Sequence, residues 1–337
     1  MLQRGGCAIR ITMLVLSEKQ VQSLIDIEEL ISTLEKAHVQ YSTGKAVMPV
    51  RLVVPLPEIQ GRITSMPGFL NVDRALGMKV VTYFPDNPKG GLPGILATIM
   101  LFSAETGKLI ATMDGSYITA IRTACASAMA TKALANPQTP VLGILGAGVQ
   151  ARAHIEALTR VRSIERIRIY SPSGMGAPGI KNDMEPTVKI PIEVARSAEE
   201  AVRDADLVAT VTTAKQPIVN RQWLKPGAHI NAVGSHRPDL REIDGATLAR
   251  SKIVVDSREA VMAECGDILL AIKENNISSD SIHAEIGEVL AGVKSGRTSA
   301  GEITLYKSVG IAIQDVAAAN LVYRKALELK IGTNVEI

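Results

Sequence analysis

An apolar run that breaks into closely spaced glycines, VLGILGAGVQA at residues 141–151, constrains the fold of this chain most. The apolar part is typical of a buried strand, and the segment that follows it has the spacing of an amphipathic helix. A glycine turn between a strand and a helix is the context of a dinucleotide-binding motif. Gly146 would allow the tight turn, and Gly148 would let a pyrophosphate approach the backbone. The N–H groups at the helix start, at Val149 and Gln150, would face the phosphates.

The surrounding pattern indicates two kinds of domain. After residue 123, further apolar runs (RIRIYS, DLVATVTT, HINAVGS and KIVVDS) alternate with polar helical segments. This alternation is typical of a parallel sheet covered on both faces, so we expect a doubly wound α/β domain over residues 123–310. Before it, short β-branched segments separated by Pro and Gly follow a helix, which predicts an α+β domain over residues 14–122.

Composition excludes several classes of function. The 37 basic and 34 acidic residues are spread along the chain, and aromatic residues make up only 3%. A nucleic-acid surface needs clustered cations and stacking aromatics, so we expect no nucleic-acid partner. No apolar run is long enough to span a bilayer, and the cysteines and histidines show no metal-ligand spacing, so we expect no membrane and no metal. Three scattered cysteines suit a reduced, cytoplasmic protein. We expect residues 1–13 to be a disordered tail or a wrongly assigned start.

The end of the second expected strand of the α/β domain bears on the cofactor. An NAD enzyme commonly carries Asp or Glu there, to accept a hydrogen bond from the ribose 2′-hydroxyl. This chain instead reads Tyr-Ser-Pro-Ser, which places Ser171 and Ser173 at the position. Two hydroxyls can donate to a 2′-phosphate, whereas a carboxylate would repel it. The pattern favours NADP(H), with NAD(H) also possible because no Arg follows the strand directly.

Three basic residues fall where a surface charge is less expected. Arg51 and Lys79 lie in predicted strands, and Arg122 lies near the start of a predicted helix. A guanidinium can bind a planar carboxylate through two hydrogen bonds, and a lysine adds a point charge. A solvated cation or a structural ion pair would explain each of them singly. Together they are candidates for a site that binds a small anion.

Four long motifs in the chain resemble one family. They are GAGVQA, MDGSYITAIRTACASA, KPGAHINAVGSHRPDLREID and TLYKSVGIAIQDVAAANLVY. From about Leu14 to about residue 325 the chain is similar to the ornithine cyclodeaminase and μ-crystallin superfamily, and most similar to its ketimine reductase branch. The resemblance implies a homodimer, in which residues 14–122 with 311–337 form the substrate-binding and dimerisation domain around a Rossmann domain.

The resemblance also assigns roles to residues of the site. It implies that Arg51, Lys79 and Arg122 hold the substrate carboxylate, with Lys79 also catalytic. It further implies cofactor contacts at five positions, namely Thr123, Gln150, Thr212, Val233 and Ser308.

One departure from the family distinguishes its branches. Cyclodeaminases and related alanine dehydrogenases carry Asp where this chain has His236. A cyclodeaminase needs that carboxylate for acid–base chemistry, whereas hydride addition to a protonated C=N does not. His236 would either relay a proton or only line the nicotinamide pocket.

We therefore expect NAD(P)H-dependent reduction of cyclic ketimines of the Δ1-pyrroline-2-carboxylate or Δ1-piperideine-2-carboxylate type. The partner would be a small anionic imino or oxo acid. Three alternatives stay open: amination of a 2-oxo acid as by alanine dehydrogenase, ornithine cyclodeamination, and NADPH-dependent carriage without catalysis.

Overall fold

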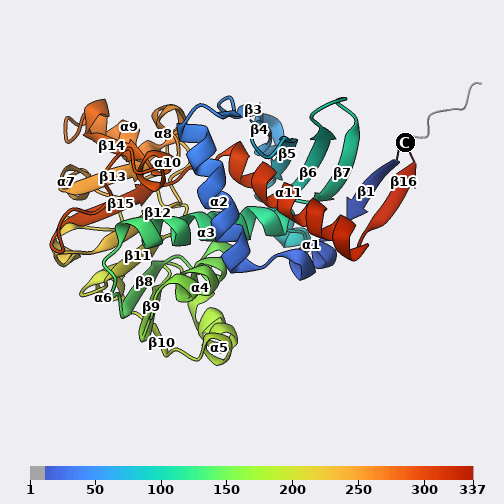
Figure 1. Cartoon of the computed structure of the whole chain (residues 1–337). Coiled ribbons are helices and arrows are strands. Elements are labelled where there is room, and N and C mark those ends of the chain that lie inside the picture. The colour runs from blue at the N-terminus through green and yellow to red at the C-terminus, as the bar shows by residue number, and fades with distance from the viewer. Residues whose placement is uncertain (1–11, 337) are drawn as a thin grey trace, which may run out of the picture.

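The computed structural model describes residues 12–336, and its strands form two sheets joined by long helices (Figure 1). The first sheet is parallel throughout. Its strands, in spatial order, are β10 (Ile192–Val194), β9 (Arg166–Tyr170), β8 (Val141–Leu145), β11 (Leu207–Thr210), β12 (His229–Ala232), β15 (Ile303–Lys307), β13 (Ser251–Val255) and β14 (Ile282–Glu285). The central strands are almost wholly buried, as expected for a sheet with both faces covered. The expected doubly wound fold is confirmed.

The glycine turn lies where the strand order of this sheet reverses. From β8 the chain proceeds through α4 (Val149–Val161) to β9 on one side, and later to β11 on the other side. Ligands of open α/β sheets bind at such a reversal, outside the carboxyl ends of the strands. The remaining helices of this part of the chain are α5 (Ala177–Val188), α6 (Ala198–Val202), α7 (Gly245–Ala249), α8 (Arg258–Glu264), α9 (Gly266–Lys273) and α10 (Ile286–Leu290).

The second sheet is mixed and mostly antiparallel. Its order is β16 (Thr333–Glu336), β1 (Thr12–Leu16), β7 (Leu109–Asp114), β6 (Ile95–Ser103), β5 (Ala75–Tyr83), β4 (Gly61–Leu70) and β2 (Ala46–Val47), and β3 (Leu52–Leu56) also pairs with β4. The predicted strands of the α+β part are therefore present. Helices α1 (Glu18–Leu24) and α2 (Ile27–Ser42) follow β1, and α1 begins with a capping box formed by Ser17 and Gln20.

The last helix returns to the second sheet. Helix α11 (Ala312–Leu329) packs against β4, β5 and β6, although it follows β15 of the parallel sheet in the chain (Figure 1). Gly68 and Gly77 face this helix: a Cβ at either position would lie in ordinary contact with Val316, at 3.5 and 3.4 Å. Residues more than two hundred positions apart in sequence thus meet between α11 and β5.

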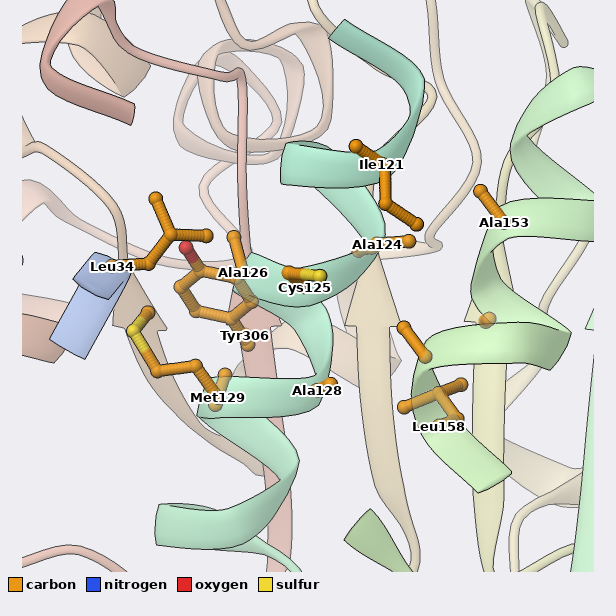
Figure 2. Packing of buried hydrophobic residues seen from close by; sticks show 14 of the residues in the cluster. Leu34, Ile121, Ala124, Cys125, Ala126, Ala128, Met129, Ala153, Leu158 and Tyr306 are labelled. Carbon is orange, nitrogen blue, oxygen red and sulfur yellow. The ribbon is translucent and has the colours of Figure 1, made fainter. Parts of the chain in front are cut away.

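Helix α3 (Ser116–Leu134) runs between the two sheets and is buried along most of its length. Its alanines and small polar residues allow α2 and α4 to pack closely on either side of it. Figure 2 shows Ala124, Ala128 and Met129 of α3 near Leu34 of α2 and Leu158 of α4. The expected domain boundary between residues 122 and 123 falls inside this continuous helix, so the exact division into domains stays a prediction.

Part of the expectation for residues 1–13 lies outside the described residues, which begin at Thr12. Thr12 and Met13 belong to β1, where they pair with β16. Among residues 12–336, no helix has the length and hydrophobicity to cross a membrane.

Candidate active site

A cavity of about 680 Å³ opens between the second sheet and the carboxyl ends of the parallel strands. Its floor is one face of the second sheet. Side chains alternate between the two faces of a strand, so Arg62, Thr64 and Met66 of β4 line the cavity together. Eight of the predicted site residues line it, namely Arg51, Lys79, Arg122, Thr123, Gln150, Thr212, Val233 and His236. The predicted substrate cations and several predicted cofactor residues therefore share one cavity.

Lys79 and Arg122 meet at a single carboxylate. The Asp315 Oδ1 atom accepts hydrogen bonds from Lys79 Nζ and from Arg122 Nε, each at 2.9 Å. All three side chains are buried, and Asp315 is on α11, Lys79 on β5 and Arg122 on α3. Among the described residues, Asp315 Oδ2 has no hydrogen-bond partner. The shared carboxylate fixes the direction of two cations, and N–H groups of Lys79 Nζ and of Arg122 Nη2 have no further protein partner among the described residues.

Burial sets the ionisation of this cluster. Removal of Lys79 from water lowers its pKa from 10.5 to about 7, and the Arg122 cation adds to this effect while Asp315 opposes it. Burial also opposes ionisation of Asp315, but the charges of Arg122 and Lys79 outweigh it and hold the pKa of that carboxyl below its usual value. Lys79 can therefore change its protonation state near neutral pH.

Gln314 and Gly310 fix the guanidinium of Arg122 from the other side. Arg122 Nη1 donates to Gln314 Oε1 at 2.6 Å, and Gln314 in turn donates to His38 Nε2 at 3.0 Å. Burial lowers the pKa of His38 to about 3, so its ring is neutral and can accept this bond. Gly310 has φ of +76°, and a Cβ there would lie 2.6 Å from Arg122 Nη1. Only glycine suits that backbone position.

Arg51 has partners of its own. Its Nε atom lies 2.8 Å from a carboxylate oxygen of Glu264, and its Nη2 atom donates to the Val309 carbonyl at 2.8 Å. The loop that carries this carbonyl is held by Asp256, whose Oδ2 accepts from the backbone N–H groups of Val309 and Gly310. The loop after β15 thus contacts both Arg51 and Arg122.

His236 lines the cavity beside the carboxyl end of β12. Its Nδ1 atom lies 2.9 Å from the Gly234 carbonyl, so Nδ1 carries the proton and donates this bond. Burial, with the charges of Arg51 and Arg62, lowers the pKa of His236 to about 4. The ring is therefore neutral at pH 7, with Nε2 as a hydrogen-bond acceptor.

The glycine turn has the shape that a dinucleotide needs. Gly146 has φ of +120°, and a Cβ there would lie 2.7 Å from the Val211 carbonyl. Gly148 caps α4, and no heavy atom lies within 4 Å of the place where its Cβ would be. Val149 is exposed at the helix start, and Gln150 Oε1 is buried without a hydrogen-bond partner among the described residues. Open space before helix N–H groups suits a pyrophosphate, and the unpartnered amide oxygen of Gln150 could accept a hydrogen bond from a hydroxyl or amide N–H of a dinucleotide.

Glu242 fixes the cofactor wall on the other side of the turn. Its carboxylate accepts hydrogen bonds from the backbone and hydroxyl of Thr212 and from the backbone of Gly234, at 2.7–2.8 Å. These bonds join the ends of β11 and β12, where Thr212 and Val233 line the cavity. Glu242 is fully buried, and burial raises its pKa.

The other predicted cofactor residues lie outside the cavity lining. Ser171 and Ser173 follow β9, with their Oγ atoms 3.1 Å apart; Ser171 is partly exposed and Ser173 is exposed to solvent. Gly146, Gly148 and Val149 form the turn described above. Ser308 is buried behind the cavity wall and donates to Asp256, which sets it back from the space that a ligand would enter.

Sequence reasoning missed Asp315, Glu264 and Arg62. Asp315 had a readable signal, because it is an acidic residue within the apolar segment IAIQDVAAA, and a buried charge is seldom unpaired. Glu264 is likewise an acidic residue within a mostly apolar segment, AVMAECG, which is a weaker signal of the same kind, and Arg62 had none. Only the tertiary structure brings them to Arg51 and to the cavity.

Comparison with known proteins identifies the family. The model of the ornithine cyclodeaminase/mu-crystallin family matches residues 11–330. The chain is 41% identical to the ketimine reductase mu-crystallin of Mus musculus, over 91% of this chain and 96% of that one.

Two solved structures have the same fold over nearly the whole chain. One is Thermococcus litoralis Δ1-pyrroline-2-carboxylate reductase in complex with NADH and L-proline, with a TM-score of 0.93, 44% identity, and coverage of 96% of this chain and 100% of that one. The other is an archaeal alanine dehydrogenase dimer with bound NAD, with a TM-score of 0.91, 38% identity, and coverage of 96% and 99%. This chain belongs to the ornithine cyclodeaminase/mu-crystallin family.

Proposed function

We propose that this protein reduces cyclic 2-imino acids to cyclic amino acids with a nicotinamide cofactor. The observation that carries the proposal is the placement of Arg51, Lys79 and Arg122 in the same cavity as Gln150 and Thr212. A small carboxylate bound by these cations would lie beside the nicotinamide. The Thermococcus litoralis relative, whose structure contains NADH and L-proline, supports this class of substrate.

The cations would bind and orient the substrate. Arg122 and Lys79 keep N–H groups free of Asp315. The guanidinium of Arg51, fixed by Glu264, lies at the loop after β15 that also contacts Arg122. Holding the carboxylate fixes the ring of the imino acid relative to the cofactor, and such positioning is a large part of catalysis. Because these cations are buried or nearly so, they bind the anion with little competition from water.

The bound nicotinamide would supply a hydride to the carbon of the C=N bond. Lys79 would provide the proton of the imine nitrogen, since its pKa of about 7 allows it to donate near neutral pH. The low pKa of His236 supports the second interpretation of that residue, which is to line the pocket as a neutral acceptor. We propose that its Nε2 atom receives a hydrogen bond from the substrate.

The cofactor preference, the oligomeric state and the cellular compartment are also proposals. Ser171 and Ser173, with no carboxylate at the end of β9, support a preference for NADP(H) over NAD(H). The archaeal alanine dehydrogenase dimer supports a homodimer. The free cysteines of the described chain, Cys125 and Cys265, support a reducing compartment such as the cytoplasm.

A spectrophotometric screen tests the function. Oxidation of NADPH and NADH is followed with Δ1-pyrroline-2-carboxylate, with Δ1-piperideine-2-carboxylate, and with pyruvate plus ammonia. We expect fast oxidation with the cyclic imines. Fast oxidation only with pyruvate plus ammonia would instead assign an alanine dehydrogenase. Proline formed from ornithine without net cofactor turnover would assign a cyclodeaminase, and cofactor binding without any oxidation would assign a carrier.

A further inference from the structure

Arg62 differs from the other cationic side chains of the cavity. Those others each contact a carboxylate: Arg51 contacts Glu264, Lys79 and Arg122 contact Asp315, and Arg237 contacts Asp239. Within residues 12–336, no carboxylate forms an ion pair or hydrogen bond with Arg62. A half-buried guanidinium with no carboxylate in direct contact, and only the more distant charge of Asp239 acting on it, is costly unless a ligand supplies a partner.

The backbone register places Arg62 at the opposite end of the cavity floor from Lys79. Lys79 pairs with Met66 across β4 and β5, and Arg62 pairs with Tyr83 in the same ladder. Arg62 is four residues from Met66 on the same face of β4, which corresponds to about 13 Å along the strand. The floor therefore has an inner cationic end at Lys79 and an outer one at Arg62.

Tyr83 holds the outer guanidinium in place. The Arg62 Cζ atom lies 4.4 Å from the centroid of the Tyr83 ring, a cation–π contact that orients the guanidinium plane. Burial, with the nearby cations of Arg237 and Arg51, lowers the pKa of Arg62, while Tyr83 and Asp239 oppose this shift. Stacking on one face leaves the edge of the fork available for a planar anion.

We propose that Arg62 binds a second acidic group of the substrate, so that the preferred substrates are cyclic imino acids with two carboxylates. This inference rests on the proposed function, because the first carboxylate is the one assigned to Arg51, Lys79 and Arg122. The same cation repels an open-chain diamino acid, whose far end is an ammonium group, and so disfavours the substrates of a cyclodeaminase.

A matched pair of ligands tests the proposal without turnover. Pipecolate and cis-piperidine-2,6-dicarboxylate differ by one carboxylate, and their dissociation constants are measured by calorimetry on the full chain with saturating NADP⁺. We expect the wild type to bind the dicarboxylate at least about tenfold more tightly, the strength of one charge-assisted hydrogen bond. Arg62→Gln should abolish this ratio, whereas Arg62→Lys should keep part of it.

The double variant Arg237→Gln/Asp239→Asn is the matched control, because it removes another cavity arginine together with the carboxylate that balances its charge. It should keep most of the ratio. The proposal is overturned if the wild type shows no preference, if Arg62→Gln keeps the preference, or if the double control variant loses as much of it. Thermal unfolding of each variant shows that the fold is retained.

Turnover separates this proposal from the proposed function. The rates of NADPH oxidation are compared for Δ1-piperideine-2-carboxylate and Δ1-piperideine-2,6-dicarboxylate. Oxidation with neither imine rejects the reductase, while the binding ratios still decide the role of Arg62. Oxidation of both with equal kcat/KM in wild type and Arg62→Gln rejects the role of Arg62 and leaves the reductase standing.

Discussion

Lys79 Nζ lies 2.9 Å from Asp315 Oδ1, and neither side chain is more than 2% exposed. The two residues are on β5 and α11, so the last long helix of the chain holds a cation of a cavity whose floor comes from the first hundred residues. A buried charge that loses its partner is strongly destabilising. The pair therefore couples the stability of the fold to the charge of the candidate active site.

Neutralising Asp315 should destabilise the protein. Asp315→Asn keeps the shape of the side chain but leaves Arg122 without a counter-charge, and we expect the free energy of unfolding at pH 7 to fall by about 3 kcal/mol. Urea denaturation measures the change. Asp239→Asn is the control, because its ion pair with Arg237 is half-exposed and should contribute less than about 1 kcal/mol. Equal losses in the two variants would show that Asp315 has no special role.

The pH dependence of the reaction should follow Lys79. Its pKa of about 7 means that the ammonium form, which can bind a carboxylate and donate a proton, predominates below pH 7 and is lost above it. We expect kcat/KM for a cyclic imine to fall as the pH rises through about 7. Lys79→Arg stays cationic, so its profile should lack this fall even where its rates are lower. Identical profile shapes would assign the titration to the substrate.

The motifs predicted the architecture well because they are local. The glycine turn of residues 146–148 and the alternation of strands and helices depend on neighbours in sequence, which suffices to place a parallel sheet. The pairing of charges depends on contacts between distant segments, such as Arg51 with Glu264. A charged residue in a polar stretch looks the same whether it faces solvent or a cavity, so Arg62 gave no signal.

Substitution of the two glycines of the turn should affect different properties, stability at Gly146 and cofactor binding at Gly148. Gly146→Ala forces a side chain into φ of +120° and against the Val211 carbonyl, so we expect destabilisation on the order of 1–3 kcal/mol. Gly148→Ala meets no protein atom and has φ of −100°, so its stability should change by less than about 1 kcal/mol. Its methyl group would instead occupy the space of the pyrophosphate and weaken cofactor binding. Thermal unfolding and NADH fluorescence titration measure the two effects. Wild-type NADH affinity in Gly148→Ala would remove the cofactor from this turn.

A carboxylate after β9 should change the choice of cofactor. Ser171→Asp places a negative charge where we propose the 2′-phosphate of NADP(H), so the KM for NADPH should rise more than the KM for NADH. We expect the ratio of kcat/KM for NADH to kcat/KM for NADPH to rise at least about tenfold. The 2′-phosphate would lose one hydrogen bond from Ser171 and would be repelled by the added carboxylate. Ser163→Asp, on the loop between α4 and β9 away from the cavity, is a suitable control. An unchanged ratio would reject the proposed 2′-phosphate site.

Loss of Arg51 should weaken substrate binding more than it slows the bound complex. Arg51→Leu removes a guanidinium that is 17% exposed. We expect kcat/KM to fall by an amount that corresponds to about 2–3 kcal/mol of lost transition-state stabilisation, mainly through a higher KM. The substitution also leaves Glu264 with a poorly solvated charge, so the protein should be less stable. Arg196→Leu, whose side chain is 91% exposed, controls for loss of charge at the surface.

The double variant Arg51→Leu/Glu264→Gln separates the two effects of this substitution. It removes the stranded carboxylate, so it should recover the stability lost in Arg51→Leu, as measured by urea denaturation. It should not recover KM, because the cation that binds the substrate is still absent. Recovery of KM together with stability would mean that Arg51 serves the fold alone, and the substrate carboxylate would then have to be bound by Lys79 and Arg122.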